Sequence, residues 1–300
     1  MQHWRFRRRL RRIIAIGDGV ARVQPGVVHA DLNRELAKTG RIFGPDPATS
    51  SVTTMGSVIA VDASGSYWPQ YGSARRHVES LQIMLSDGRL LEVGNEPLTG
   101  AAKAVDGRRE LVGQLAELVH AQASAIADAR PRSMVNRCGY HLSGVLEQGH
   151  LDLAKIVTGS EGTLALITEA TVRTQLLPRV RGVALLFFDR LESAATAALQ
   201  VPPLGAVACD MMDRRLLSIA RESDVRYDPL LPSSTEAMLL VEFHGDHVDD
   251  VRDSLDAVVS RLHRTEHLAF DARTSTDEED IEFFWQLPRR VVPMLYRLRG

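Results

Sequence analysis

The chain has 300 residues, of which 44% are hydrophobic and 25% charged, with 36 Lys and Arg side chains against 38 Asp and Glu. At the usual domain length of about 100–200 residues, one to three domains are expected, and this composition excludes a wholly disordered, collagen-like or coiled-coil chain. The formal net charge of -2 gives no general attraction to nucleic acid or to anionic membranes. We therefore expect no nucleic-acid partner.

The two cysteines, Cys138 and Cys209, are too few for a disulfide framework or a cysteine metal cluster. Free thiols are typical of a reducing compartment, so we expect a cytoplasmic chain, with peripheral attachment to the inner face of the membrane as the alternative. No apolar run reaches the roughly 18–20 residues that a membrane helix needs.

Residues 1–12 carry six arginines around Trp4, Phe6 and Leu10. The apolar stretch that follows, Ile13–Ile16, is too short for a secretory signal. A transit peptide or a nucleic-acid arm would fit the charge. We favour a third interpretation, in which this segment is the tail of an element that begins upstream, because a predicted strand follows it without any start signal.

The first half of the chain predicts short strands, two helices and one long loop. Residues 43–65 are rich in Gly, Ser, Thr and Pro, and long loops inside compact domains are usually functional. The longer helix should bury one face, formed by Leu111, Leu115, Leu118 and Val119. In chain order we expect hairpins of Ile13–Ile16 with Val20–Val23 and of Leu81–Leu85 with Leu90–Val93, helices over Val28–Thr39 and Arg108–Ala127, and strands at Ile156–Val157, Leu164–Thr168 and Thr171–Thr174.

Beyond Pro178 the pattern changes to regular alternation of strands and helices, which is typical of a split βαβ module. The final segment, Asp280–Leu298, has a helical composition that Pro288 and Pro293 are expected to break. The expected strands are Gly182–Phe188, Ala206–Met211, Ala237–Phe243 and His267–Phe270, and the expected helices are Leu191–Leu199, Asp213–Arg221 and Val248–Leu262.

Two local patterns are candidates for a functional site, and the first of them could hold an anion. The first is the long loop, where glycines allow close approach of a ligand and small hydroxylated residues add donors for a group such as a diphosphate; it contains Pro45-Asp46-Pro47, Ser50, Thr54-Met55-Gly56-Ser57 and Ala63-Ser64-Gly65. The second is the glycine turn Gly159-Ser160-Glu161-Gly162-Thr163. Taken singly, each could also be an ordinary surface loop or a plain turn.

Together the two patterns resemble those of FAD-dependent oxidoreductases with the PCMH-type, vanillyl-alcohol-oxidase-like FAD-binding domain. The branch that the chain is most similar to contains the D-lactate, glycolate and D-2-hydroxyglutarate dehydrogenases. The resemblance also covers, in the same order, Arg22–Val27, Tyr71-Gly72, Asp87-Gly88, Asn136, Gly139-Tyr140, Phe284-Trp285 and Pro293–Leu295.

This resemblance implies an α+β fold in which residues 1–178 form part of a two-lobed FAD-binding domain and residues 179–300 form an incomplete ferredoxin-like cap domain. FAD would extend between the two lobes, near Pro45 and Asp46. Its pyrophosphate and ribityl groups would contact Thr54, Gly56, Ser57, Ala63, Ser64 and Gly65, and its adenosine end would lie beside Glu161, Gly162 and the backbone of Ile167.

The implied reaction removes a hydride from the α-carbon of a small D-2-hydroxy acid and transfers it to the flavin, with D-lactate as the expected substrate. A quinone or a cytochrome would be the electron acceptor. An alternative is a catalytically silent flavin-domain remnant or an FAD-binding subunit of a larger oxidase complex. No catalytic residue is assigned. We expect no metal, because His77, His141, His244 and His247 form no ligand motif.

The chain departs from the family pattern in three ways. The lobe that usually precedes the segment at Ile13 is absent, so we expect a fragment whose missing lobe comes from another polypeptide, and the cap ends early at Gly300. Ser57 replaces a usual Gly, and Asp62 a usual Asn. An ionised Asp62 about 6 Å from a diphosphate charge would cost on the order of 3 kcal/mol. Protonation of Asp62, rotation of its side chain away from the diphosphate, or a neighbouring arginine, Arg75 or Arg76, could relieve this repulsion. Phe284 and Trp285 are expected to pack the cap against the flavin domain.

Overall fold

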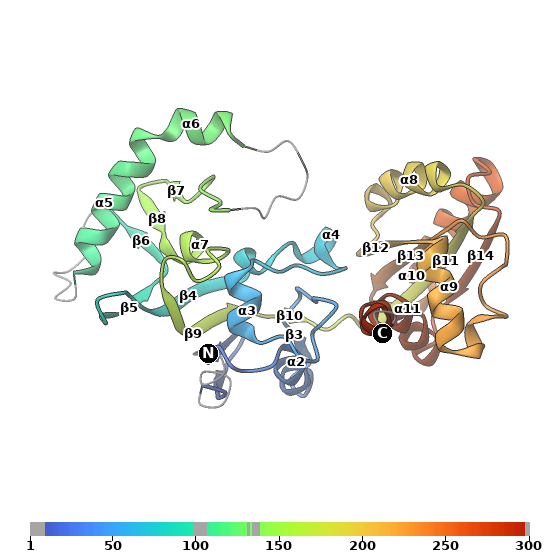
Figure 1. Cartoon of the computed structure of the whole chain (residues 1–300), viewed down its shortest axis with the longest axis horizontal. Helices are drawn as coiled ribbons and strands as arrows, with labels where there is room; N and C mark the ends of the chain where they lie inside the picture. The colour runs from blue at the N-terminus through green and yellow to red at the C-terminus, as the bar shows by residue number, and fades with distance from the viewer. Residues whose placement is uncertain (1–9, 99–106, 131–132, 134–138, 298–300) are drawn as a thin grey trace. The chain divides into compact units, whose positions relative to one another are not determined.

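The computed structural model describes residues 10–98, 107–130, 133 and 139–297. Two compact units divide the chain (Figure 1). The first unit comprises Met1–Ser64 and Ser73–Leu177, and the second comprises Gly65–Gly72 and Pro178–Gly300. The second unit resumes at Pro178, and it includes Gly65–Gly72, which lie within the residues 1–178 of the expected flavin domain. Asn136, which is part of the family resemblance, and Cys138 lie outside the described residues.

The first unit is built on a five-stranded antiparallel sheet. Both predicted hairpins are present in it, and the two predicted strands after Gly162 are one continuous strand. The strand order is β1 (Ile13–Ile16), β2 (Val20–Val23), β9 (Leu166–Arg173), β4 (Val78–Met84) and β5 (Leu90–Val93).

Helices and two small sheets complete this unit around one apolar core. One small sheet pairs β3 with β10, and the other has the order β6-β8-β7. The elements are α2 (His29–Ala37), β3 (Arg41–Ile42), α3 (Met55–Ala60), β6 (Asn95–Pro97), α5 (Arg108–Ala121), α6 (Ala123–Asp128), β7 (Leu146–Glu147), β8 (His150–Asp152), α7 (Leu153–Val157) and β10 (Gln175–Leu176).

Two predictions in the first unit are wrong. Val119 is buried as predicted, but Leu118 is 58% exposed, because helix α5 turns Val112 and Ala116 inward instead. The residues Ile156–Val157 belong to helix α7 rather than to a strand. The carboxylate of Asp152 caps this helix by accepting the Lys155 amide at 2.9 Å, and a short apolar run cannot by itself be assigned to a strand or a helix.

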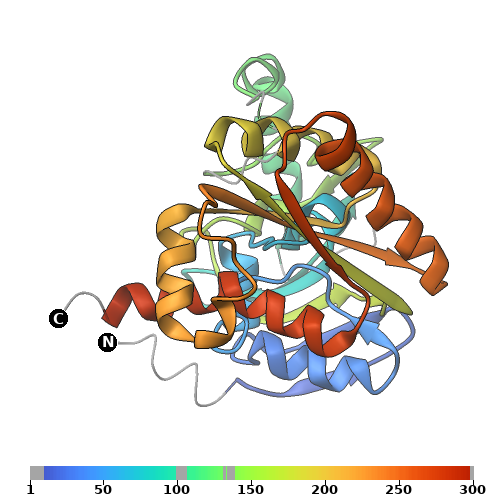
Figure 2. The ribbon, with the colours of Figure 1, turned by 90° about the vertical axis from the view of Figure 1, so that its right-hand side faces the viewer.

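The second unit contains a four-stranded antiparallel sheet with the order β12-β13-β11-β14, which is the predicted split βαβ arrangement (Figure 2). The α+β fold prediction is therefore confirmed. The strands are β11 (Val180–Phe188), β12 (Ala208–Asp213), β13 (Ala237–Gly245) and β14 (Asp271–Ser275), and the helices are α4 (Trp68–Tyr71), α8 (Leu191–Gln200), α9 (Arg214–Ser223), α10 (Val248–Val259) and α11 (Glu278–Arg297).

Both faces of this sheet are buried, which explains why β11 is apolar at consecutive positions. Leu185 and Phe187 point into a core with residues of α9 and α11. Leu186 and Phe188 point into a separate core with residues of α8 and α10. The two cores place helices on opposite sides of one sheet.

The end of the second unit differs from the prediction. Helix α11 runs from Glu278 to Arg297 through Pro288 and Pro293 without a break. Its first turns are fixed by four buried side chains at helical spacing, Ile281, Phe284, Trp285 and Leu287, and this burial offsets the hydrogen bonds that proline removes. Strand β14 begins at Asp271 rather than at His267, because a π-helical turn over Ser260–Thr265 extends α10.

Candidate functional site

The long loop and the glycine turn meet in the first unit, beside helix α3. The amide of Gly159 donates to the carbonyl of Ile59 at 3.0 Å, and the amide of Glu161 donates to the carbonyl of Ala60 at 2.9 Å. These residues are about 100 positions apart in the sequence, so the contact is made by the tertiary fold. The two patterns that resemble FAD-binding segments are therefore in direct contact.

A buried ion pair joins the same two segments. Asp62 is 2% exposed, and its carboxylate accepts the Arg75 amide at 2.8 Å and the Arg75 Nε at 3.2 Å. The remaining nitrogens of Arg75 donate to three backbone carbonyls, those of His141 at 2.8 Å, Lys155 at 2.7 Å and Thr158 at 2.6 Å. Arg75 is thus the cation that relieves the charge of Asp62, while Arg76 is exposed.

Glycine is required at position 159 by this ion pair. The residue has φ of +84°, and a Cβ there would lie 2.9 Å from Arg75 Nη2 and 3.3 Å from Asp62 Cβ. A side chain would therefore push against the guanidinium that holds the two segments together. Gly159 serves the packing of the site rather than the approach of a ligand.

The base of the long loop is closed by hydrogen bonds between its ends. The amide of Asp46 donates to the Ser64 carbonyl at 2.7 Å, and the Ala63 carbonyl accepts the amide of Ala74 at 2.8 Å. The carbonyl of Pro45 lies 2.7 Å from Nε2 of the buried His29. Backbone hydrogen bonds therefore hold the predicted FAD contacts Pro45, Asp46, Ala63 and Ser64 in place.

The middle of the loop is the short helix α3, capped by Thr54. The hydroxyl of Thr54 accepts the amide of Ser57 at 3.4 Å and lies 3.2 Å from the Ser57 hydroxyl. A Cβ at position 56 would lie 2.6 Å from Cβ of Pro25, so Gly56 is explained by packing inside the protein. Ser57 itself is exposed and can reach a ligand.

The glycine turn is open where a ligand would approach. Glu161 and Gly162 both have left-handed backbones, with φ of 52° and 76°, and both are exposed. A Cβ at position 162 would meet nothing within 4 Å. Ile167 lies further along, inside strand β9 opposite Ile83. Gly65, with φ of 84°, begins the segment that groups with the second unit.

These observations fit a dinucleotide with an anionic diphosphate. Asp62, the buried carboxylate at the meeting point, is paired with Arg75. Ser57, Glu161 and Gly162 are exposed, and the resemblance implies that the Glu161 carboxylate lies beside the adenosine end rather than the diphosphate. Contacts of the individual residues with FAD stay predictions.

A test of these contacts uses two glycines with matched geometry. Gly149 has φ of +75° and open space around it, as Gly162 does, but it lies in the turn between β7 and β8. Gly162→Ala and Gly149→Ala should each destabilise the fold by about 1–2 kcal/mol, because both force alanine into a left-handed backbone. Only Gly162→Ala should weaken FAD binding, by about tenfold, measured by flavin fluorescence titration. Equal FAD affinity in the two variants would remove Gly162 from the site.

A second buried cluster was missed by the sequence analysis. In the second unit, the side chains of Tyr67, Arg181, His244 and Trp285 surround the carboxylate of Glu242, which is fully buried. Burial raises the pKa of Glu242, but hydrogen bonds from His244 and Arg181, together with the Arg181 charge, outweigh burial and hold the pKa at about 2. Phe284 and Trp285 pack in the core of this unit, with Tyr67 from Gly65–Gly72.

His29 makes the loop sensitive to acid. Its Nδ1 is buried without a hydrogen-bond partner among the described residues, and burial lowers its pKa despite the nearby Asp46 charge and the Pro45 carbonyl. Below about pH 6.5, His29 is protonated in the unfolded chain but stays neutral in the folded chain. The free energy of unfolding should therefore fall as the pH falls, by at most about 1.4 kcal/mol per pH unit.

Urea denaturation between about pH 7.5 and pH 5.5 measures this effect. The slope of stability against pH should become smaller in His29→Gln and should stay unchanged in the control His150→Gln, whose side chain is exposed. An unchanged slope in His29→Gln would show that another group causes the acid sensitivity.

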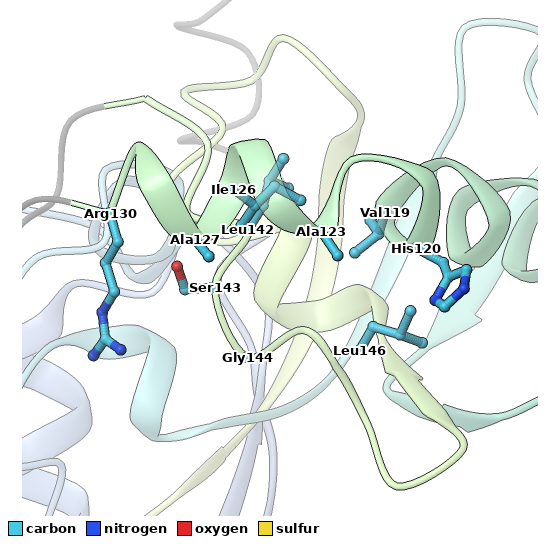
Figure 3. A pocket seen from close by; sticks show the side chains of 10 residues that line it. All are labelled: Val119, His120, Ala123, Ile126, Ala127, Arg130, Leu142, Ser143, Gly144 and Leu146. Atoms are coloured by element: carbon cyan, nitrogen blue, oxygen red, sulfur yellow. The ribbon is translucent and has the colours of Figure 1, made fainter.

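A cavity of about 420 Å³ lies elsewhere in the first unit, between helices α5 and α6 and the segment 142–146 (Figure 3). None of the predicted cofactor residues lines it. Arg130 and His120 are its charged or titratable side chains, and Ala123, Ile126 and Leu142 contribute to its apolar walls. Among the described residues, no group of three or more His, Cys, Asp or Glu could hold a metal ion, and no helix is long and apolar enough to cross a membrane.

Comparison with known proteins identifies two family domains. Residues 5–94 match the FAD binding domain family, and residues 177–300 match the C-terminal domain of FAD linked oxidases. Among solved structures, alkyldihydroxyacetonephosphate synthase has a similar fold, with a TM-score of 0.60 at 17% identity, covering 96% of this chain and 48% of that one.

Curated relatives share sequence over most of the chain. It is 32% identical over 85% of its length to a D-2-hydroxyglutarate dehydrogenase of Escherichia coli, and 24% identical over 93% to the glycolate oxidase subunit GlcD of Bacillus subtilis. A mitochondrial D-lactate dehydrogenase (cytochrome) of Saccharomyces cerevisiae is 26% identical over 67%. The chain spans 26%, 48% and 26% of these three relatives.

The two matched domains, in this order along the chain, confirm both the family resemblance and FAD as the cofactor. The chain belongs to the FAD-linked oxidoreductases that combine a PCMH-type FAD-binding domain with an FAD-linked oxidase C-terminal domain, the group that includes D-2-hydroxyglutarate dehydrogenases and glycolate oxidase subunits.

Proposed function

We propose that this chain takes part in the FAD-dependent oxidation of a small D-2-hydroxy acid to the corresponding 2-oxo acid. The observation that carries the proposal is the meeting of the long loop with the glycine turn, held by Asp62 and Arg75, in a chain whose two matched domains are both FAD-linked. The names of its relatives, which are dehydrogenases and an oxidase subunit for 2-hydroxy acids, support this substrate class.

The chemistry divides between the cofactor and the chain. FAD, when bound, supplies an acceptor for the hydride from the carbon that carries the hydroxyl group, while the hydroxyl proton is released. The chain would hold and orient the cofactor through the Ser57 hydroxyl and the open backbone at Gly162, and Arg75 pairs the charge of Asp62.

Within this class, D-lactate is the substrate that the sequence analysis predicts, and the named substrate of the Escherichia coli relative makes D-2-hydroxyglutarate its main competitor. The electron acceptor is proposed to be a quinone or a cytochrome, as the name of the yeast relative suggests. The expected cytoplasmic location remains part of this proposal.

The visible spectrum of the purified chain tests the proposal. We expect the absorbance of oxidised flavin and, without oxygen, its bleaching by D-lactate or D-2-hydroxyglutarate. The L-isomers, added as controls, should leave the spectrum unchanged. Colourless protein that added FAD does not stabilise would contradict the proposal.

One observation favours a second candidate, an FAD-binding subunit of a larger oxidase. The Bacillus subtilis relative is itself named as a subunit, and the chain spans 48% of it. In that case the chain would show the flavin spectrum without bleaching, and a partner polypeptide would restore bleaching by the same hydroxy acid.

A further inference from the structure

The segment Gly65–Gly72 links the FAD-binding loop to the second unit. It follows Ser64 directly in the chain, and Ser64 closes the loop by accepting the Asp46 amide. The segment itself packs in the second unit, where the Tyr67 ring is 8% exposed and lies 5.4 Å from the Trp285 ring between centroids. Ser66 adds a hydrogen bond of 2.6 Å to Asp210 on strand β12.

One carboxylate fixes this segment from the centre of the sheet. Glu242, on strand β13, accepts the Tyr67 hydroxyl at 3.0 Å and also accepts the Trp285 indole N–H. Arg181 of β11 donates to both oxygens of the carboxylate, at 2.8 and 3.3 Å. Nε2 of His244 lies 2.7 Å from Oε1. Oε2 of Glu242 is therefore shared by Tyr67, Trp285 and Arg181. Oε1 is shared by Arg181 and His244.

The position of Tyr67 depends on this charge. A buried carboxylate is stable only when its oxygens are well hydrogen-bonded, and bonds to an ionised acceptor are stronger than bonds between neutral groups. Arg181 also donates to the Tyr67 hydroxyl at 3.3 Å, and its other terminal nitrogen is held by Glu278 and Glu282. The cation and the carboxylate thus both hold the phenol, and each is itself held by other residues.

We propose that Glu242 is a positioning residue for FAD: by anchoring Tyr67, it fixes the segment that begins at Gly65 and with it the end of the FAD-binding loop at Ser64. The proposal rests on the proposed function, since Ser64 and Gly65 are the predicted FAD contacts next to the anchor. Only a peptide bond separates the anchored segment from the loop. Without the Tyr67 anchor, the loop end would therefore be held only by its own hydrogen bonds, such as that of the Ser64 carbonyl with the Asp46 amide.

The first test measures FAD affinity in single and double variants. Glu242→Gln keeps the shape of the side chain and removes its charge, and Tyr67→Phe keeps the ring and removes the hydroxyl. Each should raise the FAD dissociation constant by about tenfold. The double variant should bind FAD no more weakly than the worse single variant, because both act through one contact.

The control is Glu236→Gln. Glu236 precedes β13 and accepts Arg214 at 2.7 Å, but both side chains are exposed, so the dissociation constant should change by less than about twofold. A Glu242→Gln protein that melts at a lower temperature but binds FAD as the wild type does would overturn the proposal, and so would additive effects of Glu242→Gln and Tyr67→Phe.

A second measurement separates this proposal from the proposed function. Chymotrypsin cuts after aromatic residues, and Tyr67 and Tyr71 lie in the anchored segment. Without FAD, the segment should be cut faster in Glu242→Gln than in the wild type or in Glu236→Gln. If the wild type binds no FAD, the proposed function fails, but faster cutting of Glu242→Gln would still support the anchoring of Tyr67 by Glu242. Equal cutting rates in all three proteins would overturn the proposed anchor.

Discussion

Arg75→Ala should lower the free energy of unfolding of the first unit by about 3–5 kcal/mol. The substitution leaves the carboxylate of Asp62 buried without its cation and removes the donors to the carbonyls of His141, Lys155 and Thr158. Breaking one side of a buried ion pair is expensive because the remaining charge keeps its desolvation cost. Urea denaturation followed by circular dichroism measures the loss.

Two further variants separate charge from packing. Arg76→Ala removes an exposed neighbouring arginine and should change stability by less than about 0.5 kcal/mol. Asp62→Asn introduces the residue that the family usually has, keeps an acceptor for the Arg75 amide, and should cost less than Arg75→Ala. If Arg75→Ala were no more harmful than Arg76→Ala, the ion pair would not hold the two segments together.

The same ion pair shows how far sequence reasoning reaches at the site. The glycine patterns located both segments, and a neighbouring arginine was one of three explanations for how the charge of Asp62 is tolerated; the structure shows that Arg75 pairs with it. The reasons for the glycines could not be obtained that way. A side chain at position 56 would collide with Pro25, and one at position 159 would collide with Arg75. Both contacts exist only in the folded chain.

The fold was predictable where periodicity and burial agree. Strand β11 is apolar at consecutive positions because both of its faces are covered, and the helices around it have clear apolar faces. Prediction failed where tertiary contacts determine the local secondary structure. Burial of Phe284 and Trp285 carries helix α11 through Pro288, and Asp152 makes a helix of the short apolar run before Thr158.

The cluster around Glu242 lay beyond the sequence patterns for a related reason. Tyr67 and Glu242 are 175 positions apart, and Trp285 is a further 43 positions along the chain. No local spacing connects three such residues. The signal that could have pointed to them is a charged residue, Glu242, inside an otherwise apolar run on β13, because a buried charge needs partners from other segments.

Trp285→Ala should lower the free energy of unfolding of the second unit by about 3–5 kcal/mol, because Trp285 is 1% exposed and its removal leaves a large cavity. Trp285→Phe keeps an aromatic ring and should cost about 1–2 kcal/mol, for the lost hydrogen bond to Glu242. Leu199→Ala, at a position 74% exposed on α8, is the control and should change little. Urea denaturation followed by circular dichroism compares the three. If Trp285→Ala matched Leu199→Ala, the ring would not be part of this core; if Trp285→Phe matched Trp285→Ala, the hydrogen bond to Glu242 rather than the filled volume would be the main contribution of Trp285.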